Sequence, residues 1–434
     1  FISKVSEFQE LLDVRHSVML IGPNGCGKTS IWSTLAACHN DGAKKPICVY
    51  ETVNPKSITS NELYGYMSLA KDWKDGVLSI IMRNMSKNNM PYHDFQSYKW
   101  VVLDGDIDAI WIESMNTVMD DNKVLTLVSN ERIPLSPAMR MIFEINSLAN
   151  ATPATVSRAG ILFINETDIG YTPYIESWIE SRTAVHETST LPGFFEKYIP
   201  RAFEIIKQND LSTIVPVSKM CTIQSICYLL DGLLAQIDPE DTTKGADEIE
   251  HIFVMACLWA FCGPLTDDKK SASRTKFNTL WRSEFKKVIF PGEGHVLDYY
   301  YDVDSGDILP WSGKVEEYVH VGDGNFSSIF VPTVNSTRMT AYVDRLVRRK
   351  RPVLLVGAAG TGKTQLLREY LRNMEEGHLF CTINMNYYTD SLALQQQLEA
   401  PVEKRSGKVF GPPAQKYLVY FIDDLNMPFK EEYG

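Results

Sequence analysis

One motif of eight residues occurs twice and constrains the fold of this chain more than any other feature. It reads Gly-Pro-Asn-Gly-Cys-Gly-Lys-Thr at residues 22–29, the first loop, and Gly-Ala-Ala-Gly-Thr-Gly-Lys-Thr at residues 357–364, the second loop. Four apolar residues precede each loop, at 18–21 and 353–356, and such runs are typical of buried parallel strands. The repeat therefore predicts two related units in one chain.

A helix and a later strand follow each loop. Apolar residues recur at helical spacing directly after the loops, at Ile31, Trp32, Leu35 and Ala36 and again at Leu366, Leu367, Tyr370 and Leu371. Further along, an apolar run ends in Asp104 in the first copy and in Asp423 in the second. This order predicts an α/β fold with doubly wound parallel sheets, whose ligands lie at the carboxyl ends of the strands.

The composition of both loops suits the phosphate chain of a nucleotide. Glycines let the backbone fold tightly, so that successive N–H groups and the start of the helix point at an anion. We therefore predict that ATP or ADP is bound by Gly22, Pro23, Asn24, Gly25, Cys26, Gly27, Lys28 and Thr29, and by Gly357, Ala358, Ala359, Gly360, Thr361, Gly362, Lys363 and Thr364. The two lysines should reach the β and γ phosphates.

The same pattern predicts a magnesium ion at each loop. The hydroxyls of Thr29 and Thr364 are expected to ligate Mg²⁺. Asp104 and Asp423 would hold the ion from the neighbouring strand end, directly or through water.

The residue after each of these aspartates bears on whether bound ATP is cleaved. Many P-loop ATPases place a glutamate there to orient the attacking water, but this chain has Gly105 and Asp424. Glycine offers no carboxylate, and the shorter aspartate withdraws it by about 1.5 Å. We expect the first site to hold ATP rather than cleave it, unless Asp106 or Asp108 compensates. At the second site, Asp424 is the candidate for slow catalysis.

Residues between the two copies contain no phosphate loop. Apolar residues at helical spacing from 203 to 259 predict a mostly helical subdomain. It includes a buried helix at 252–262, which is shorter than the roughly 20 residues that span a bilayer. Short strands and turns are expected from 299 to 330. We therefore divide the chain into an α/β subdomain at 1–167, a helical subdomain with its connection at 168–325, and a second α/β subdomain at 326–434.

Charge and cysteine content narrow the class of partner. The formal net charge of −11 gives no overall field that would attract nucleic acid or an anionic membrane, so we expect neither as a partner. The eight cysteines show no C-x-x-C pair or zinc spacing and are expected to be reduced, intracellular thiols. The N-terminus has neither an initiator methionine nor a signal peptide, which indicates a piece of a longer chain.

Two charged stretches have simple interpretations. The basic run at 345–351 is expected to be a solvated helix end that leads into the apolar strand at 353–356. The acidic stretch at 238–243 is expected to be a solvated loop.

Longer strings of residues resemble the dynein heavy chain family. Residues 99–123, which contain Lys-Trp-Val-Val-Leu-Asp-Gly-Asp, resemble its second AAA+ module, as does Ala-Thr-Val-Ser-Arg at 154–158. Phe-Gly-Pro-Pro at 410–413 and Phe-Ile-Asp-Asp-Leu-Asn-Met-Pro at 421–428 resemble its third module in the axonemal form. The resemblance covers nearly the whole chain and implies tandem P-loop AAA+ modules.

The resemblance also implies function. It implies a segment of an ATP-driven motor ring of six modules, located in the cytoskeleton of the axoneme of a cilium or flagellum. The first site would then be a structural ATP brace and the second a regulatory site, with ATP or ADP and Mg²⁺ as cofactors. The implied partners are the other AAA+ modules of the same heavy chain, microtubules, and the intermediate and light chains of dynein. Since the sequence ends at Gly434, we expect this segment to lack the remaining parts of the third module and not to move on microtubules alone.

Two further site residues come from the resemblance. Arg158 matches the arginine finger that the second module presents to the nucleotide of the preceding module, where a guanidinium stabilises charge on a transferring phosphoryl group. The alternative for Arg158 is an ordinary surface arginine near a turn. Asn146 occupies the place of the polar sensor residue.

Two other functions stay open on the sequence. A tandem AAA+ remodelling ATPase, such as a midasin-like ring or a helicase, would carry an Asp-Glu pair at one or both sites, where this chain has Asp104-Gly105 and Asp423-Asp424. A nucleotide-stabilised scaffold would show no hydrolysis anywhere in the parent chain.

Overall fold

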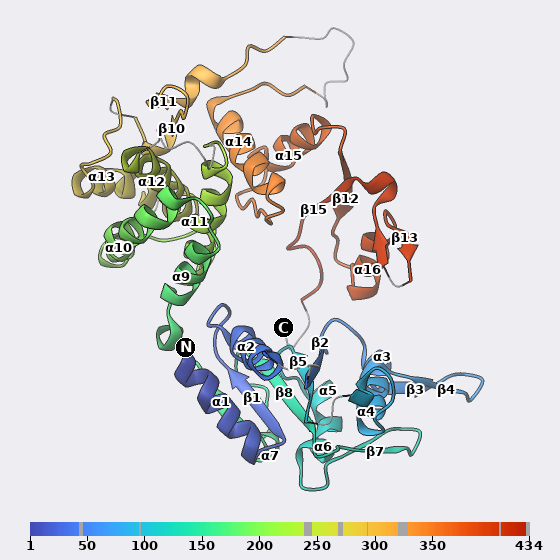
Figure 1. Ribbon diagram of the computed structural model, residues 1–434. Helices are drawn as coiled ribbons and strands as arrows, with labels where there is room; N and C mark the ends of the chain where they lie inside the picture. Colours follow the sequence, from blue (N-terminus) through green and yellow to red (C-terminus); the bar gives the residue numbers. More distant parts are fainter. Residues whose placement is uncertain are drawn as a thin grey trace. The chain divides into compact units, whose positions relative to one another are not determined.

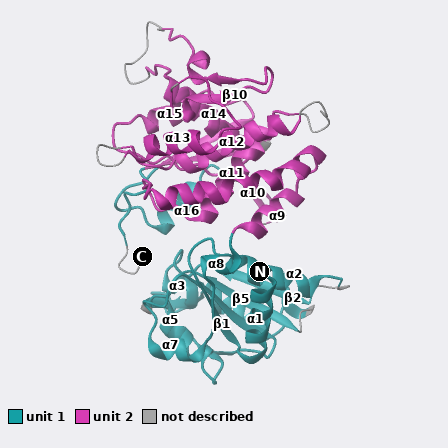
Figure 2. Cartoon of the chain, turned by 90° about the vertical axis from the view of Figure 1, so that its left-hand side faces the viewer, with its two compact units in different colours: residues 1–170, 384–402, 424–434 teal, residues 171–383, 403–423 magenta. Residues whose placement is uncertain are grey.

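The computed structural model describes residues 1–42, 47–94, 97–237, 245–267, 272–292, 294–319, 329–407 and 409–430. The acidic stretch at 238–243 lies outside these ranges. The chain forms two compact units, coloured teal and magenta in Figure 2. The first unit comprises residues 1–170, 384–402 and 424–434, and the second comprises residues 171–383 and 403–423.

A five-stranded parallel sheet organises the first unit (Figure 1). Its strands are β1 (Ser17–Ile21), β2 (Cys48–Val53), β5 (Tyr98–Asp104), β8 (Met139–Ile145) and β9 (Gly160–Phe163). They lie in the order β2-β5-β8-β1-β9, and every neighbouring pair is parallel. This arrangement confirms the predicted doubly wound sheet around the first loop.

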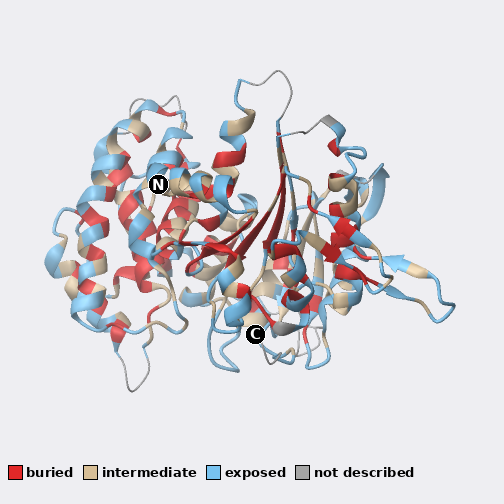
Figure 3. Ribbon diagram, turned by 90° about the horizontal axis from the view of Figure 1, so that it is seen from below, coloured by how far each residue is buried: buried red, intermediate tan, exposed pale blue. Residues whose placement is uncertain are grey.

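Both faces of this sheet are covered, which explains why its strands read as apolar runs. All five residues of β1 are buried, and buried sheet strands appear in red in Figure 3. Met19 and Ile21 join the core on one face, while Val18 and Leu20 join the core on the other. The core around Met19 and Ile21 also contains residues from α4 (Val77–Ser86), α5 (Ala109–Ile112) and α6 (Asn116–Met119). The core around Val18 and Leu20 contains residues from α1 (Ile2–Val14) and α2 (Lys28–Asn40).

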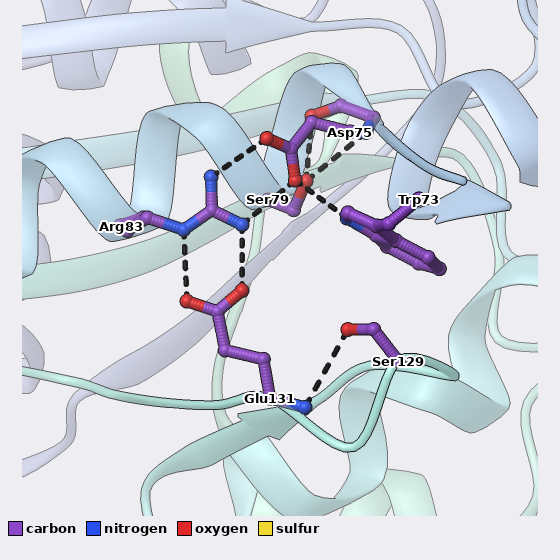
Figure 4. A network of polar contacts seen from close by, with 7 residues as sticks. Trp73, Asp75, Ser79, Arg83, Ser129 and Glu131 are labelled. Carbon is purple, nitrogen blue, oxygen red and sulfur yellow. Dashed lines mark hydrogen bonds and ion pairs between the residues drawn. The ribbon is translucent and has the colours of Figure 1, made fainter. Parts of the chain in front are cut away.

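Two small hairpins extend from the first unit and are joined by one arginine. They are β3 (Gly65–Met67) with β4 (Trp73–Asp75), and β6 (Val124–Thr126) with β7 (Arg132–Pro134). Figure 4 shows Arg83 of α4 between the carboxylates of Asp75 and Glu131, with its Nη2 atom 2.7 Å from an oxygen of each. These hydrogen bonds hold the pKa of both carboxyls below the ordinary value. Arg83 therefore links both hairpins to one helix.

The remaining elements of the first unit are short. They are α3 (Ser60–Tyr64), α7 (Pro153–Arg158), α8 (Glu166–Ile169), α16 (Ser391–Glu399) and the 3₁₀ turns Tyr92–Asp94 and Glu113–Met115.

The second unit contains the predicted helical subdomain. Its helices are α9 (Thr172–Glu180), α10 (Val185–Gln208), α11 (Lys219–Leu234), α12 (Ala246–Cys262), α13 (Ser273–Glu284), α14 (Val334–Arg348) and α15 (Lys363–Arg372). Most of α12 is buried, which confirms the predicted buried helix at 252–262. Within the described ranges, every helix falls short of the length or apolar character that crossing a bilayer requires.

Short strands and turns follow α13, as predicted. The strands β10 (Tyr299–Tyr301) and β11 (Ile308–Pro310) form an antiparallel pair flanked by the 3₁₀ turns Val296–Asp298 and Trp311–Lys314. Residues 320–328, which complete the predicted stretch, lie outside the described ranges.

The predicted strand at 353–356 is wrong. These residues adopt no strand, and Leu354 is 67% exposed. A parallel strand needs hydrogen-bonded neighbours, and among the described residues none is paired with this run. The described strands of this region are β12 (His378–Asn384) with β15 (Tyr417–Asp423), and β13 (Glu403–Ser406) with β14 (Val409–Gly411), followed by the 3₁₀ turn Pro413–Gln415. The predicted strand that ends at Asp423 is confirmed.

The basic run at 345–351 only partly matches its prediction. Helix α14 ends at Arg348, whose side chain is 51% exposed. Arg351 is not simply solvated, because its Nη2 atom donates to Asp231 Oδ2 at 3.2 Å and its guanidinium lies 4.2 Å from the centre of the Tyr228 ring. The eight cysteines are all free thiols.

Candidate nucleotide-binding sites

The first loop has the tight backbone that its glycines predict. Gly25 and Gly27 have φ values of 81° and 95°, a conformation that favours glycine. A Cβ atom on Gly22 would lie 2.3 Å from the carbonyl oxygen of Ile164. The loop is therefore built around positions that admit no side chain, and its N–H groups lie at the start of α2, as phosphate binding requires.

Lys28 points back into the first loop. Its ammonium group donates to the carbonyl oxygens of Gly22 at 2.7 Å and Pro23 at 3.1 Å, and to Asn146 Oδ1 at 3.4 Å. The residue is only 9% exposed. The charge of Lys28 thus lies among oxygen acceptors in the loop, which suits it to phosphate oxygens.

The hydroxyl of Thr29 has a partner that the sequence analysis missed. Thr29 Oγ1 donates to Glu144 Oε2 at 2.8 Å, and the indole N–H of Trp32 donates to Glu144 Oε1. Glu144 lies on β8 opposite Asp104 of β5 in the strand register and is 4% exposed, whereas Asp104 is exposed. Burial raises the pKa of Glu144, although the hydrogen bonds from Trp32 and Thr29 act in the opposite direction. The sequence signal was the only acidic residue of β8, which stands in the apolar run Met141–Ile145.

Other polar residues at this sheet edge hold one another in place. Asp106 accepts hydrogen bonds from the backbone N–H of Asn146 at 2.6 Å and from its amide Nδ2 at 3.1 Å. Asp108 caps α5 by accepting from the backbone N–H groups of Ile110 and Trp111. Asp106 and Asp108, the two residues that could compensate for the missing carboxylate at Gly105, therefore both accept hydrogen bonds from neighbouring residues.

Gly105 stands where many P-loop ATPases carry a glutamate, and little space surrounds it. A Cβ atom there would lie 3.1 Å from Asn54 Oδ1 and 3.2 Å from Pro55 Cδ. Any side chain at this position would require its neighbours to shift.

Arg158 is the last residue of α7. Its Nη2 atom lies 3.7 Å from Asp120 Oδ2, and its side chain is 31% exposed. The ion pair is loose, so the guanidinium keeps most of its hydrogen-bonding capacity.

The second loop repeats the geometry of the first. Gly360 and Gly362 have φ values of 77° and 83°. Lys363 Nζ donates to the carbonyl oxygens of Gly357 at 2.9 Å and Ala358 at 2.7 Å. The two loops therefore share one backbone arrangement.

The structure brings together the predicted metal ligands of the second loop. Thr364 Oγ1 donates to Asp423 Oδ1 at 3.2 Å. Asp424, the next residue, has a φ of 55°, which is uncommon for an aspartate.

The residues of both loops fit a nucleotide with magnesium. Among the described residues, no group of three or more His, Cys, Asp or Glu side chains could hold a metal by itself. Magnesium usually takes one or two protein ligands and completes its shell with phosphate oxygens and water. Each loop offers a threonine hydroxyl beside a carboxylate, which is such a partial ligand set.

Family models match three successive parts of the chain. Residues 17–159 match the AAA domain of the dynein-related subfamily, and residues 191–313 match the AAA lid domain of dynein heavy chains. Residues 318–434 match the P-loop containing dynein motor region. These matches, together with the parallel sheet and the helices, show AAA+ P-loop domains with a helical lid region.

Relatives that are similar to this chain over its whole length agree with these matches. The chain is 46% identical to the dynein beta chain of the flagellar outer arm of Chlamydomonas reinhardtii and 45% identical to the ciliary dynein beta chain of Heliocidaris crassispina. It is 44% identical to the human dynein axonemal heavy chain 9. Each comparison covers 100% of this chain but only 9% or 10% of the relative. The chain belongs to the axonemal dynein heavy chain family.

Proposed function

We propose that this chain is a segment of an ATP-driven, microtubule-based motor ring in the axoneme of a cilium or flagellum. In this proposal the first site holds ATP with Mg²⁺ as a structural brace, and the second is a regulatory site with slow hydrolysis. The proposal is supported by the two P-loops and by relatives that are named as ciliary, flagellar or axonemal dyneins. The other AAA+ modules, microtubules, and the intermediate and light chains of dynein are the proposed partners. A midasin-like remodelling ATPase is less consistent with these relatives.

The proposal that the first site holds ATP without cleaving it is based on the surroundings of Gly105. Gly105 supplies no carboxylate, and the nearby Asn54 and Pro55 leave little room for one. Asp106 and Asp108, the two possible substitutes, are held by other hydrogen bonds. A bound ATP would therefore lack a carboxylate placed to orient the attacking water.

The second site differs because a carboxylate, Asp424, follows Asp423. We assign Asp424 to catalysis at a low rate, since its side chain is one methylene shorter than glutamate. Nucleotide at this site would regulate the ring by binding one conformation more tightly than another.

We also assign roles in nucleotide sensing and in completing a neighbouring site to two residues outside the loops. Asn146 serves as the polar sensor of the first site, which its position 3.4 Å from Lys28 Nζ supports. Arg158 serves as the finger toward the nucleotide of the preceding module, and its loose ion pair leaves it free to be recruited. The chain is divided functionally at 1–167, 168–325 and 326–434, which the three family-model matches support.

The test measures binding of ATP and ADP to the chain and follows phosphate release for many hours. Lys28→Ala isolates the second site, Lys363→Ala isolates the first, and the double variant is the blank. The expected result is tight ATP binding that needs Lys28 and leaves ATP intact, with slow release only where Lys363 is present. Steady phosphate release from the Lys363→Ala variant would refute the brace, and a double variant that still binds ATP would refute both sites.

A further inference from the structure

Glu144 is a carboxylate at the first loop that receives two hydrogen bonds from α2. Thr29 Oγ1 donates to its Oε2 atom at 2.8 Å, and the Trp32 indole donates to its Oε1 atom. Both donors lie on the helix that begins at the loop, while Glu144 lies on β8. The carboxylate is thus fixed at both oxygens inside the unit.

The direction of the Thr29 hydrogen bond matters for metal binding. A hydroxyl that ligates a cation presents an oxygen lone pair to the metal, so its proton must point elsewhere. Glu144 Oε2 accepts that proton and leaves the lone pairs of Thr29 available. A negatively charged acceptor also makes the hydroxyl oxygen a better ligand for Mg²⁺.

At the second loop, a different carboxylate accepts the proton of the threonine hydroxyl. There the threonine hydroxyl of Thr364 donates to Asp423, the strand-end aspartate that follows in the motif. At the first loop the equivalent Asp104 is exposed, and its register neighbour Glu144 receives the hydroxyl proton instead. The two sites therefore use carboxylates from different strands for the same purpose.

We propose that Glu144 is the magnesium-positioning residue of the first site: it orients the Thr29 hydroxyl toward the metal, and Trp32 holds Glu144 in place. This inference rests on the proposed binding of ATP with Mg²⁺ at the first loop. It assigns Glu144 an effect on metal-dependent binding rather than a catalytic role.

The test compares ATP affinity in Mg²⁺ and in EDTA, in the 434-residue chain carrying Lys363→Ala so that only the first site reports. Glu144→Gln keeps the size of the side chain but has only one acceptor oxygen, for which the Thr29 hydroxyl and the Trp32 indole N–H would compete. It should weaken ATP binding in Mg²⁺ about tenfold or more and leave binding in EDTA unchanged. Adding Trp32→Phe removes the second donor, so the amide oxygen can turn to Thr29 and most of the lost affinity should return.

Thr29→Val is the matched control, because it removes the hydroxyl that Glu144 orients. It should lose the same magnesium dependence, and Glu144→Gln should add nothing to it. The inference is overturned if Glu144→Gln binds ATP like its parent in Mg²⁺, or if it loses affinity equally in Mg²⁺ and EDTA. The proposed function fails separately, by absence of ATP binding to the Lys363→Ala parent itself. Thermal unfolding without nucleotide identifies variants that do not fold, and the Thr29 variants then decide the question.

Discussion

The two loops of this chain have nearly the same backbone but different surroundings. Their paired glycines have φ values of 81° and 95° in the first loop and of 77° and 83° in the second, and each lysine donates to two carbonyl oxygens of its own loop. The first loop follows a buried strand of a five-stranded sheet, while the second follows residues 353–356, which form no strand. Loop geometry is therefore a local property of the motif, and the partner of the threonine hydroxyl depends on the sheet.

The largest expected difference between the loops lies in their first glycines. Gly22→Ala would place a Cβ atom 2.3 Å from the carbonyl oxygen of Ile164, whereas the nearest atom to a Cβ on Gly357 is Thr361 Oγ1 at 3.5 Å. We expect Gly22→Ala to lower the free energy of unfolding by about 3 kcal/mol and Gly357→Ala to change it by less than about 0.5 kcal/mol. Urea unfolding without nucleotide measures both, and equal effects would show that the surroundings of the loops do not differ as described.

A second comparison concerns the strand-end aspartates. Asp423 accepts the Thr364 hydroxyl proton, while Glu144 takes this role beside Asp104. Asp423→Asn should therefore lower the magnesium-dependent affinity of the second site for ATP about tenfold, and Asp104→Asn should lower that of the first site only about threefold. ATP titrations in Mg²⁺ and EDTA measure this, with Lys28→Ala or Lys363→Ala silencing the other site. An Asp104→Asn effect as large as that of Asp423→Asn would remove the distinction.

The smallest effect is expected on phosphate release. Asp424→Glu lengthens an existing carboxylate and should raise the slow release at the second site about threefold. Gly105→Glu introduces a side chain where Asn54 and Pro55 already lie within 3.4 Å of a Cβ atom, so it should not activate the first site. Single-turnover assays on each variant measure the rates, and Gly105→Ala controls for crowding alone. Rapid release from Gly105→Glu would mean that only the missing carboxylate had prevented hydrolysis.

Local patterns were enough to predict much of the fold. The strands that end at Asp104 and Asp423, the helices that begin at Lys28 and Lys363, and the buried helix α12 all have strong periodic patterns of their own. The pairing of Thr364 with Asp423 follows from the motif, because loop and strand end meet at one edge of a sheet.

Features that depend on distant parts of the chain were not predicted. Glu144 faces Thr29 only because β8 lies beside both β1 and β5, and a single sequence does not state that register. The run at 353–356 has the composition of a strand, but pairing requires neighbours that composition does not reveal. The contact of Arg351 with Asp231 likewise joins residues far apart in the sequence.

The contact between Arg351 and Asp231 connects the second loop to the helical part of its unit. Asp231 of α11 accepts from Trp178 and Arg182 as well as from Arg351, which lies just ahead of the second loop. Residues 353–356 form no strand, so this ion pair, rather than a sheet, connects the backbone just before the second loop to α11. Arg351→Ala would therefore remove an attachment of the second phosphate loop to α11 without changing any residue of the loop itself.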